Sequence, residues 1–280
     1  MGLPQELVDL IIGALHDDLP TLKSCSLTCK SMFVSTRRLI HQILYLTPRN
    51  NERILTKGET MKLNKGGRDK VPQLLRILSY MGERGYLRYT RQVYISDRNG
   101  FVPKALGYHF RHFESLVEVH TLTIEFFDVI RWAPYFKRCF LQFYPTVTSL
   151  ALRASSGHYR LLLEFALQFP NLDNLSLECP EEQELIPPDL ELPGIATSPP
   201  LRGHLRLTGA TADALCLWLI DLAYVLPNGI NFRSIELEDI SGHQVQHVVD
   251  ACGRTLENLI LIPYQHGMRF LSIRPSQRND

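Results

Sequence analysis

Two pairs of histidines are spaced in a way that could hold a metal ion. His243 and His247 are four residues apart, which would place both on one face of a helix, as in zinc proteases. That chemistry needs a glutamate directly after the first histidine as general base, but Gln244 stands there and cannot accept the proton. His109 and His112 form a similar pair without a third ligand close in sequence. We therefore expect solvated surface histidines and predict no metal site.

The cysteines are the other residues that could do chemistry. Cys25 and Cys29 are four apart in an expected helix, and as zinc ligands they would need two further partners, which the sequence does not indicate. The six cysteines are irregularly spaced, which favours packed thiols in the reducing cytosol or nucleus over a disulfide framework. A Gly-x-Ser-x-Gly elbow and a dinucleotide-binding fingerprint are both missing. The chain is predicted not to be an enzyme and to need no cofactor.

Composition and charge narrow the classes of partner. The 280 residues are 45% hydrophobic and 21% charged, with a net charge of +1, so nothing favours nucleic acid. The longest apolar stretch, 215–226, contains Asp221 and is too short to span a membrane. The length suits a small domain followed by a larger one.

Residues 1–46 predict three short helical segments. Pro4 suits a first helical turn, and Asp18 is the expected N-cap of the second segment, with Pro20 early in it. The apolar or small residues at helical spacing are, segment by segment, Leu7, Leu10, Ile11, Ala14 and Leu15; Leu22, Cys25, Ser26 and Cys29; and Met32, Phe33, Leu39, Ile40, Ile43 and Leu44. A unit this small rarely has a stable core alone, so we expect it to dock on a partner or on a neighbouring domain.

These residues also follow a family pattern. The pattern Leu-Pro-x-Glu-Leu, then aliphatic positions, then an aspartate-rich turn and a Leu–Cys–Cys helix is matched by Leu3, Pro4, Glu6, Leu7, Ile11, Ile12, Leu15, Asp17, Asp18, Leu22, Cys25 and Cys29. The segment therefore resembles an F-box, and its residue pattern is similar to that of F-box proteins from mushroom-forming fungi. One departure is Met32, which stands where the family usually has tryptophan.

The resemblance implies a partner. An F-box binds the Skp-type adaptor of a cullin–RING ubiquitin ligase, and catalysis then belongs to other ligase subunits. The implied adaptor-binding residues are Leu3, Pro4, Glu6, Leu7, Ile11, Leu15, Leu22, Cys25 and Met32. The alternative is that the same apolar residues form only the core of a helical cap on the rest of the chain.

A second pattern, apolar-x-x-Leu/Ile-x-Leu/Ile, recurs after residue 90. Its central positions are 24 to 30 residues apart, apart from a last interval of 12. Full copies begin at Val119, Val147, Leu172, Phe232, Leu256 and Met268, and imperfect copies are Val93-x-Ile95 and Leu205-x-Leu207. The period resembles that of leucine-rich repeats, about 20–29 residues, although the usual repeat asparagine is missing from most copies.

The intervals between these copies predict the fold class. Apolar residues at three- and four-residue spacing indicate helices at 71–82, 101–117, 130–143, 159–169, 212–226 and 243–255. Alternating strands and helices imply parallel strands with right-handed crossovers. We therefore predict an α/β fold with an F-box-like helical domain at 1–46, a linker at 47–70 and a leucine-rich-repeat-like β/α solenoid at 71–280, with its helices outside. Coincidental α/β packing is the alternative.

Residues between and after the core positions of each strand should line the concave face of such a solenoid, because strand side chains alternate. They are Tyr94, Ser96, Thr123, Glu125, Arg153, Ser176, Glu178, Arg206, Thr208, Glu236, Glu238 and Ile260. Both charges and hydroxyls are present, which suits recognition of a target protein and shows no catalytic set.

Two other segments are expected to be loops. Residues 47–70 are rich in lysine and glycine but lack a phosphate-binding loop motif, so a solvated linker is favoured. Residues 180–200 hold five acidic residues, no basic residue and six prolines, which predicts an exposed insertion. A sharper hypothesis is that this acidic insertion selects a basic partner.

Three functions remain open from the sequence. The leading hypothesis is a substrate receptor of a Skp–cullin–F-box ubiquitin ligase, in which the F-box binds the adaptor and the repeats bind an unknown target protein. The rival is a repeat scaffold that binds proteins without a ligase, and the third is a metal-dependent hydrolase that uses His243 and His247.

Overall fold

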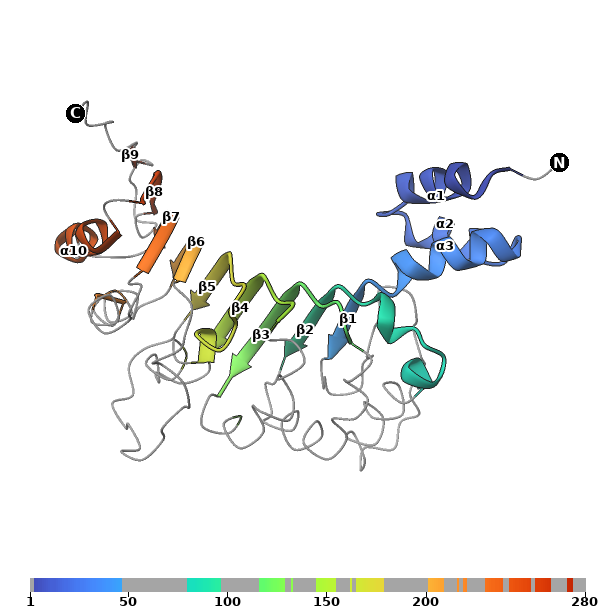
Figure 1. Ribbon diagram of the computed structural model, residues 1–280, viewed down its shortest axis with the longest axis horizontal. Helices are drawn as coiled ribbons and strands as arrows, with labels where there is room; N and C mark the ends of the chain where they lie inside the picture. The colour runs from blue at the N-terminus through green and yellow to red at the C-terminus, as the bar shows by residue number, and fades with distance from the viewer. Residues whose placement is uncertain are drawn as a thin grey trace. The chain divides into compact units, whose positions relative to one another are not determined.

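The computed structural model is of an α/β protein (Figure 1). It describes residues 3–46, 80–96, 116–128, 132, 145–154, 162, 165–178, 201–208, 216, 219–220, 230–238, 242–252, 255–262 and 271–273; of 201, 242–244 and 271–273 the backbone alone is described. Within these residues the strands follow one another in the sheet in sequence order, from β1 to β9. The chain forms two compact units: Met1–Thr123 with Pro134–Thr146, and Ile124–Ala133 with Val147–Asp280.

The first unit begins with three helices, as predicted: α1 (Gln5–Ala14), α2 (Leu19–Cys25) and α3 (Lys30–Ile40). Pro4 precedes α1, where its missing N–H is not needed. Asp18 is the N-cap of α2, and its carboxylate accepts hydrogen bonds from the Thr21 backbone N–H at 3.1 Å and from the Thr21 hydroxyl at 2.6 Å. These hydrogen bonds confirm the predicted start of α2.

The three helices share a small core. Val8, Ile12, Leu22 and Ile40 are each less than 5% exposed and form one cluster. The partly buried side chains packed against this cluster are Leu15, Leu19, Cys25, Met32 and Leu39. The core therefore accounts for one stripe of α1, the stripe that carries Val8 and Ile12.

Two parts of the helical prediction are wrong. α2 ends at Cys25, and Cys29 has an extended backbone at the N-cap of α3, so the two cysteines do not lie on one helix. The chain turns between them, where the Thr28 hydroxyl donates to the Cys25 carbonyl at 2.7 Å. Ile43 and Leu44 do not extend the third helix, because Ile43–Leu46 is the strand β1.

β1 pairs with β2 (Gln92–Ser96) as a parallel strand. Leu44 is opposite Val93 and Leu46 is opposite Ile95, and all four side chains are at most 1% exposed. β1 is therefore a further copy of the Leu-x-Leu pattern, directly after α3. The pattern did not predict this copy, because His41 occupies the position at which the full copies have an apolar residue.

A buried junction joins α3 to β1 and β2. The His41 ring is fully buried and stacks on Tyr86, with the ring centroids 4.5 Å apart, just before the short helix η1 (Leu87–Tyr89). His41 Nε2 lies 3.2 Å from Nη1 of Arg37, which can only donate, so Nε2 is the acceptor and Nδ1 carries the proton. Burial, and then the nearby Arg37 charge, lower the pKa of His41 to about 4. The Gln42 carbonyl accepts hydrogen bonds from the backbone N–H groups of residues 91 and 92.

The second unit is built on parallel strands in register. After β3 (Thr121–Phe127), which begins in the first unit, come β4 (Ser149–Ala154), β5 (Asn174–Glu178), β6 (Leu201–Thr208), β7 (Ile230–Glu238) and β8 (Asn258–Ile262). Leu150, Leu175, Leu205, Ile235 and Leu259 are opposite one another along the sheet, and none is more than 6% exposed. The register therefore aligns the central positions of the predicted copies from β4 to β8.

β6 contains a bulge at Gly203. This glycine has φ +81°, and a Cβ built there would lie 2.0 Å from the carbonyl oxygen of Asp173. A side chain is therefore excluded by both the backbone conformation and the close approach of the neighbouring chain. The backbone N–H of His204, the next residue, donates to the Asp173 carbonyl at 2.7 Å and holds β6 beside the start of β5.

The last strand corrects the prediction of parallel strands throughout. β9 (Leu271–Ile273) is antiparallel to β8, with Leu261 opposite Leu271. Residues 263–270 connect the two strands, which is shorter than the dozen or more residues that a parallel crossover needs. The interval of 12 residues in the sequence was the signal for this reversal.

α10 (Gly242–Cys252) confirms most of the predicted helix at 243–255 and contacts β7. Val248 and Cys252, one turn apart, are its buried residues among those described. The other predicted helices fall largely outside the described residues; the helical positions described there are 80–82, 132, 162, 165–166, 216 and 219–220. Leu116 and Val117, the described end of the stretch predicted at 101–117, are not helical.

Candidate protein-binding surfaces

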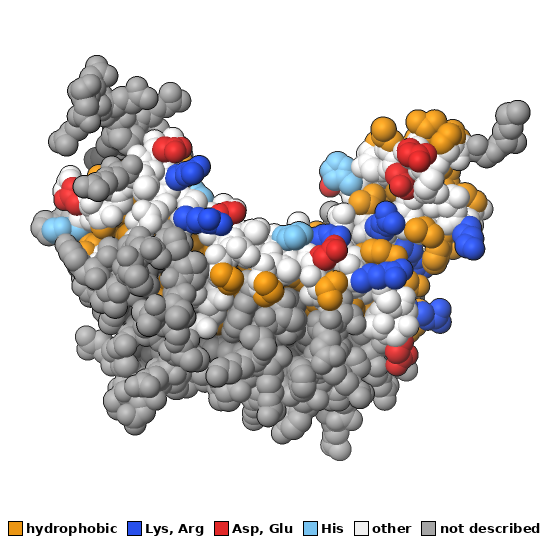
Figure 2. All heavy atoms as spheres, viewed as in Figure 1, with side chains coloured by type: hydrophobic (Ala, Val, Ile, Leu, Met, Phe, Trp, Pro, Cys, Tyr) orange, Lys and Arg blue, Asp and Glu red, His pale blue; other side chains and the backbone are white. Residues whose placement is uncertain are grey.

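α1 is apolar on its solvent side as well as on its core side. Leu3, Leu7, Leu10 and Ile11 are 59%, 48%, 72% and 47% exposed, and together they form what we call the α1 apolar face. Figure 2 shows hydrophobic side chains gathered over this helix. Isolated exposed leucines are common in proteins, but a contiguous group on one helix is typical of a surface that binds a partner.

The spacing of these residues explains why they lie together. Leu7 and Ile11 are four residues apart and Leu10 is three after Leu7, so these three share one side of α1, and Leu3 lies just before the helix begins. The predicted stripe, which ran through Leu7, Leu10 and Ile11, is therefore the exposed side of α1. The core uses a second stripe, led by Val8, which the sequence analysis did not separate from the first.

The predicted adaptor-binding residues divide into surface and interior positions. Pro4 and Glu6 are exposed with the α1 apolar face. Leu15, Cys25 and Met32 are partly buried against the core of the three helices. Leu22 is 1% exposed, so the prediction that its side chain contacts a partner is wrong: it completes the protein's own core instead.

The residues predicted to face a target are all at least partly exposed. From Tyr94 to Ile260, they alternate along the strands with the buried leucines and isoleucines, which confirms the strand alternation. For the second unit, we call this side of β4–β8 the open face. Its side chains that bear on binding are Arg153, Ser176, Glu178, His204, Arg206, Thr208, Glu236, Glu238, Ile260 and Ile262.

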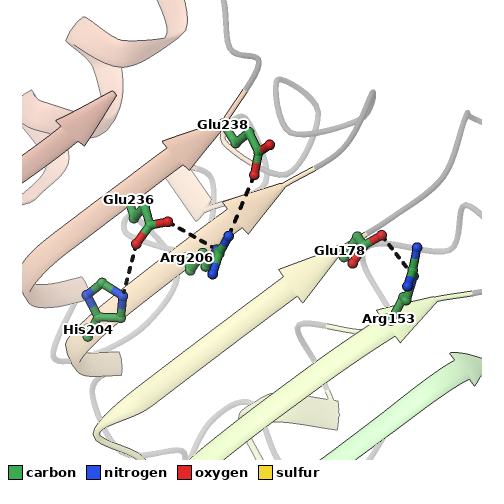
Figure 3. Close-up of polar contacts among 6 residues, drawn as sticks. All are labelled: Arg153, Glu178, His204, Arg206, Glu236 and Glu238. Carbon is green, nitrogen blue, oxygen red and sulfur yellow. Dashed lines mark ion pairs between the residues drawn. The ribbon is translucent and has the colours of Figure 1, made fainter. Parts of the chain in front are cut away.

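Ion pairs cross neighbouring strands of the open face (Figure 3). Arg153 Nε on β4 lies 2.8 Å from a carboxylate oxygen of Glu178 on β5. Arg206 on β6 lies 3.1 Å from Glu236 and 3.7 Å from Glu238, both on β7. The second carboxylate oxygen of Glu236 is 3.9 Å from His204 Nε2. These side chains are mostly well exposed, so the pairs orient one another more than they stabilise the fold.

Arg153 also contacts an aromatic ring from β3. Its guanidinium carbon lies 5.9 Å from the centre of the Phe126 ring. Phe126 has φ +56°, the only positive φ of a non-glycine residue in the described part of the chain. This backbone conformation is costly for a bulky residue, and it lets both Phe126 and its neighbour Glu125 remain partly exposed.

The corresponding strands of the first unit carry different side chains. Tyr45 on β1 and Tyr94 on β2 are opposite each other and partly exposed, with ring centres 5.5 Å apart. Ser96 on β2 and Thr121 and Thr123 on β3 are partly exposed hydroxyl residues of this region. In the first unit this surface is therefore uncharged and aromatic.

The structure adds residues that the sequence analysis left out of its candidate sites. Leu10 is the most exposed leucine of α1, and its place in the predicted stripe was the signal for it. Tyr45 and His204 follow from strand alternation next to Leu44 and Leu205. Nothing in the sequence signals Phe126, because its exposure depends on a local backbone conformation.

The residues examined for catalysis form no site in the part of the chain that the structure describes. No group of three or more metal-ligating side chains occurs among those residues. His247 is exposed, whereas the His243 side chain and both His109 and His112 lie outside the described residues. Burial raises the pKa of the Cys252 thiol to about 11, which disfavours the reactive thiolate at neutral pH. The linker at 47–70 and the acidic insertion at 180–200 also lie outside the described residues.

Comparison with protein-family models, curated protein sequences and solved structures finds no match to this chain. Function is therefore inferred from the residues and their arrangement. Among the described residues, no helix is both long and apolar enough to cross a membrane.

Proposed function

We propose that the chain is the substrate receptor of a Skp–cullin–F-box ubiquitin ligase. The observation that carries the proposal is the α1 apolar face, which lies in the segment with the F-box-like Leu-Pro-x-Glu-Leu opening. In this proposal, Leu3, Leu7 and Ile11 dock on the Skp-type adaptor, and the sheet binds the target protein.

Burial energy supports docking through α1. Each of its four aliphatic side chains is roughly half exposed or more, and covering them would contribute about 1 kcal/mol apiece. Together these side chains would contribute about 4 kcal/mol, to which polar contacts from Glu6 at the edge would add, and the full contribution requires a partner that covers the whole group at once. An extended apolar groove on a partner is the surface that satisfies this condition.

The described cysteines fit the compartment in which such ligases work. Cys25, Cys29, Cys216 and Cys252 are free thiols. Free thiols are typical of the reducing cytosol and nucleus. We propose one or both of these compartments as the location.

A different role for the helices is supported by one observation. The buried contact of His41 with Tyr86, and the hydrogen bonds to the Gln42 carbonyl, attach α3 directly to the first strands. A helical cap on a protein-binding scaffold would need such contacts whether or not a ligase is involved. A cap does not explain why α1 presents leucines to solvent, which is why the receptor is preferred.

The test is co-purification of the full chain with a fungal Skp-type adaptor. Leu7→Ser with Ile11→Ser should weaken adaptor binding by at least about tenfold, because this removes roughly 2 kcal/mol of burial. The melting temperature should stay within about 2 °C of wild type, because both side chains face solvent.

Val117→Ser is the matched control for this test. Val117 is 54% exposed in the same unit but lies outside the three helices, so its replacement should leave adaptor binding unchanged. A folded wild-type chain that does not bind the adaptor, or a Leu7→Ser/Ile11→Ser variant that binds as tightly as wild type, would favour the scaffold.

A further inference from the structure

The end of the open face combines acidic and aliphatic side chains in register. Glu236 on β7 is opposite Ile260 on β8, and Glu238 is opposite Ile262. Glu238 is 40% exposed and Ile260 is 37% exposed, while Glu236 is more enclosed at 18%. Two carboxylates therefore lie beside two isoleucines, all available from the same side of the sheet.

The charges at this end do not balance. On β4 and β5, Arg153 and Glu178 form a pair of one cation and one anion. On β6 and β7, the guanidinium of Arg206 is shared between Glu236 and Glu238. His204 adds positive charge beside Glu236 only when it is protonated. With neutral His204, this part of the open face has one more negative charge than positive.

We propose that Glu236, Glu238, Ile260 and Ile262 bind a segment of the target protein in which a lysine or arginine adjoins an aliphatic side chain. The cation would approach Glu238, the more exposed carboxylate, and the aliphatic group would cover Ile260. The proposal rests on the proposed function, in which the sheet binds the target, and it defines the chemistry of that target.

Charge complementarity excludes the opposite kind of partner. A phosphate-bearing or acidic segment would be repelled by the two glutamates, because like charges in contact are unfavourable at an interface. The residues that follow Glu178 in the sequence carry the same sign: 180–200 hold five acidic residues and no basic one. The isoleucines add apolar contact, which a small metal cation could not use.

Arg206 is a built-in competitor for the incoming cation. It occupies both carboxylates in the free protein, so a partner must displace or share this contact. Removal of Arg206 should therefore tighten binding of a basic segment, whereas removal of the glutamates should weaken it. A purely structural role for these ion pairs predicts a loss in both cases.

The experiment measures binding of a short fluorescein-labelled peptide to the full chain by fluorescence anisotropy. The probe alternates arginine with leucine between serine and glycine spacers, and its counterpart has glutamate in place of each arginine. Glu236→Gln with Glu238→Gln should weaken binding of the arginine peptide about tenfold, and Arg206→Gln should tighten it about threefold. Binding should also weaken as salt rises, because the charges lie near solvent.

Glu83→Gln with Glu118→Gln is the charge-matched control. Both residues belong to the first unit and are exposed. The variant loses two negative charges, as many as the Glu236→Gln/Glu238→Gln variant loses. Binding that falls equally in this control would show an effect of net charge alone and would overturn the site. Ile260→Ser tests the apolar half and should weaken binding about threefold to fivefold.

Three results would reject the proposal: no binding of the arginine peptide by the wild-type chain, binding of the glutamate peptide at equal strength, or weaker binding after Arg206→Gln in a variant that melts like wild type. Adaptor capture is measured on the same preparations. A chain that captures the adaptor but ignores the peptide keeps the proposed function and loses this site, whereas the reverse result loses the ligase role alone.

Discussion

The α1 apolar face is made of aliphatic side chains on one helix and just before it, whereas the open face is made of charged side chains on parallel strands, with isoleucines at one end. Burial of aliphatic groups is non-directional and supplies affinity for any matching groove. Paired charges contribute little affinity of their own, but they reject partners of the wrong charge. In the proposed function, the two surfaces would therefore suit different partners: the common adaptor for α1 and a target selected by its charge for the sheet.

The largest expected difference compares two leucines in the helical region. Leu22→Ala should lower the free energy of unfolding by about 2–5 kcal/mol, because the side chain is buried in the shared core. Leu10→Ala should change it by less than about 0.5 kcal/mol, because Leu10 is largely exposed. Urea unfolding followed by circular dichroism measures both. Similar losses for the two variants would mean that α1 has no free apolar face.

Acid should weaken the first unit through His41. The pKa of His41 is about 4 in the folded protein and about 6.5 when unfolded, so the unfolded chain binds the extra proton first. The stabilisation is fully present above pH 6.5 and is lost as the pH falls towards 4, on the order of 3 kcal/mol in all.

The His41→Phe variant is the control for this pH dependence. Phenylalanine keeps a ring against Tyr86 but cannot be protonated, so melting temperatures should fall less between pH 6.5 and 4.5 than in wild type. Equal slopes for the two proteins would show that other groups cause the acid sensitivity.

Replacing a glycine by alanine should have opposite effects on stability in α1 and in the sheet. Gly203→Ala should destabilise the chain by about 2–3 kcal/mol, because φ is +81° and the new Cβ would clash with the Asp173 carbonyl. Gly13→Ala should stabilise it by about 0.5–1 kcal/mol, because Gly13 is helical with open space around it. Thermal unfolding distinguishes the signs. A tolerated Gly203→Ala would contradict the bulge that positions His204.

The smallest expected effect concerns the ion pair at the other end of the open face. Arg153→Met should change the free energy of unfolding by less than about 0.5 kcal/mol, because both partners are well exposed and the pair is screened by solvent. The measurement is urea unfolding at low and high salt. A loss above about 1 kcal/mol would mean that the open face supports the fold itself, which would weaken the contrast with α1.

The repeated strands were predictable because the residue spacing within each copy is enough to indicate a strand and its buried side. Leu-x-Leu puts two apolar residues on the same side of a strand, and equal spacing of the copies brings strands such as β4 and β5 into register. β1 escaped this reasoning because His41 replaced the apolar residue and because Ile43 and Leu44 also suit a helix. The short last interval signals the reversal of β9, because it leaves too few residues for a parallel crossover.

The candidate surfaces were predictable only in part. Strand alternation identified Arg153, Arg206 and Glu236 as exposed side chains, because every second residue must face away from the core. Their partners were not predictable, since an ion pair across strands depends on which residues the register places opposite one another. Met32 and Leu22 were assigned to a partner, and the tertiary structure uses both for the core of the three helices.

By itself, the sequence determined where the strands from β2 to β8 lie, that they are parallel, and which side of each is buried, because these follow from local spacing. Only the tertiary structure decided which of two apolar stripes of α1 is buried. Val8 and Leu7 are equally suited to a core, and the choice depends on where α2 and α3 pack. That choice leaves Leu7 on the surface, which is what makes α1 a candidate binding face.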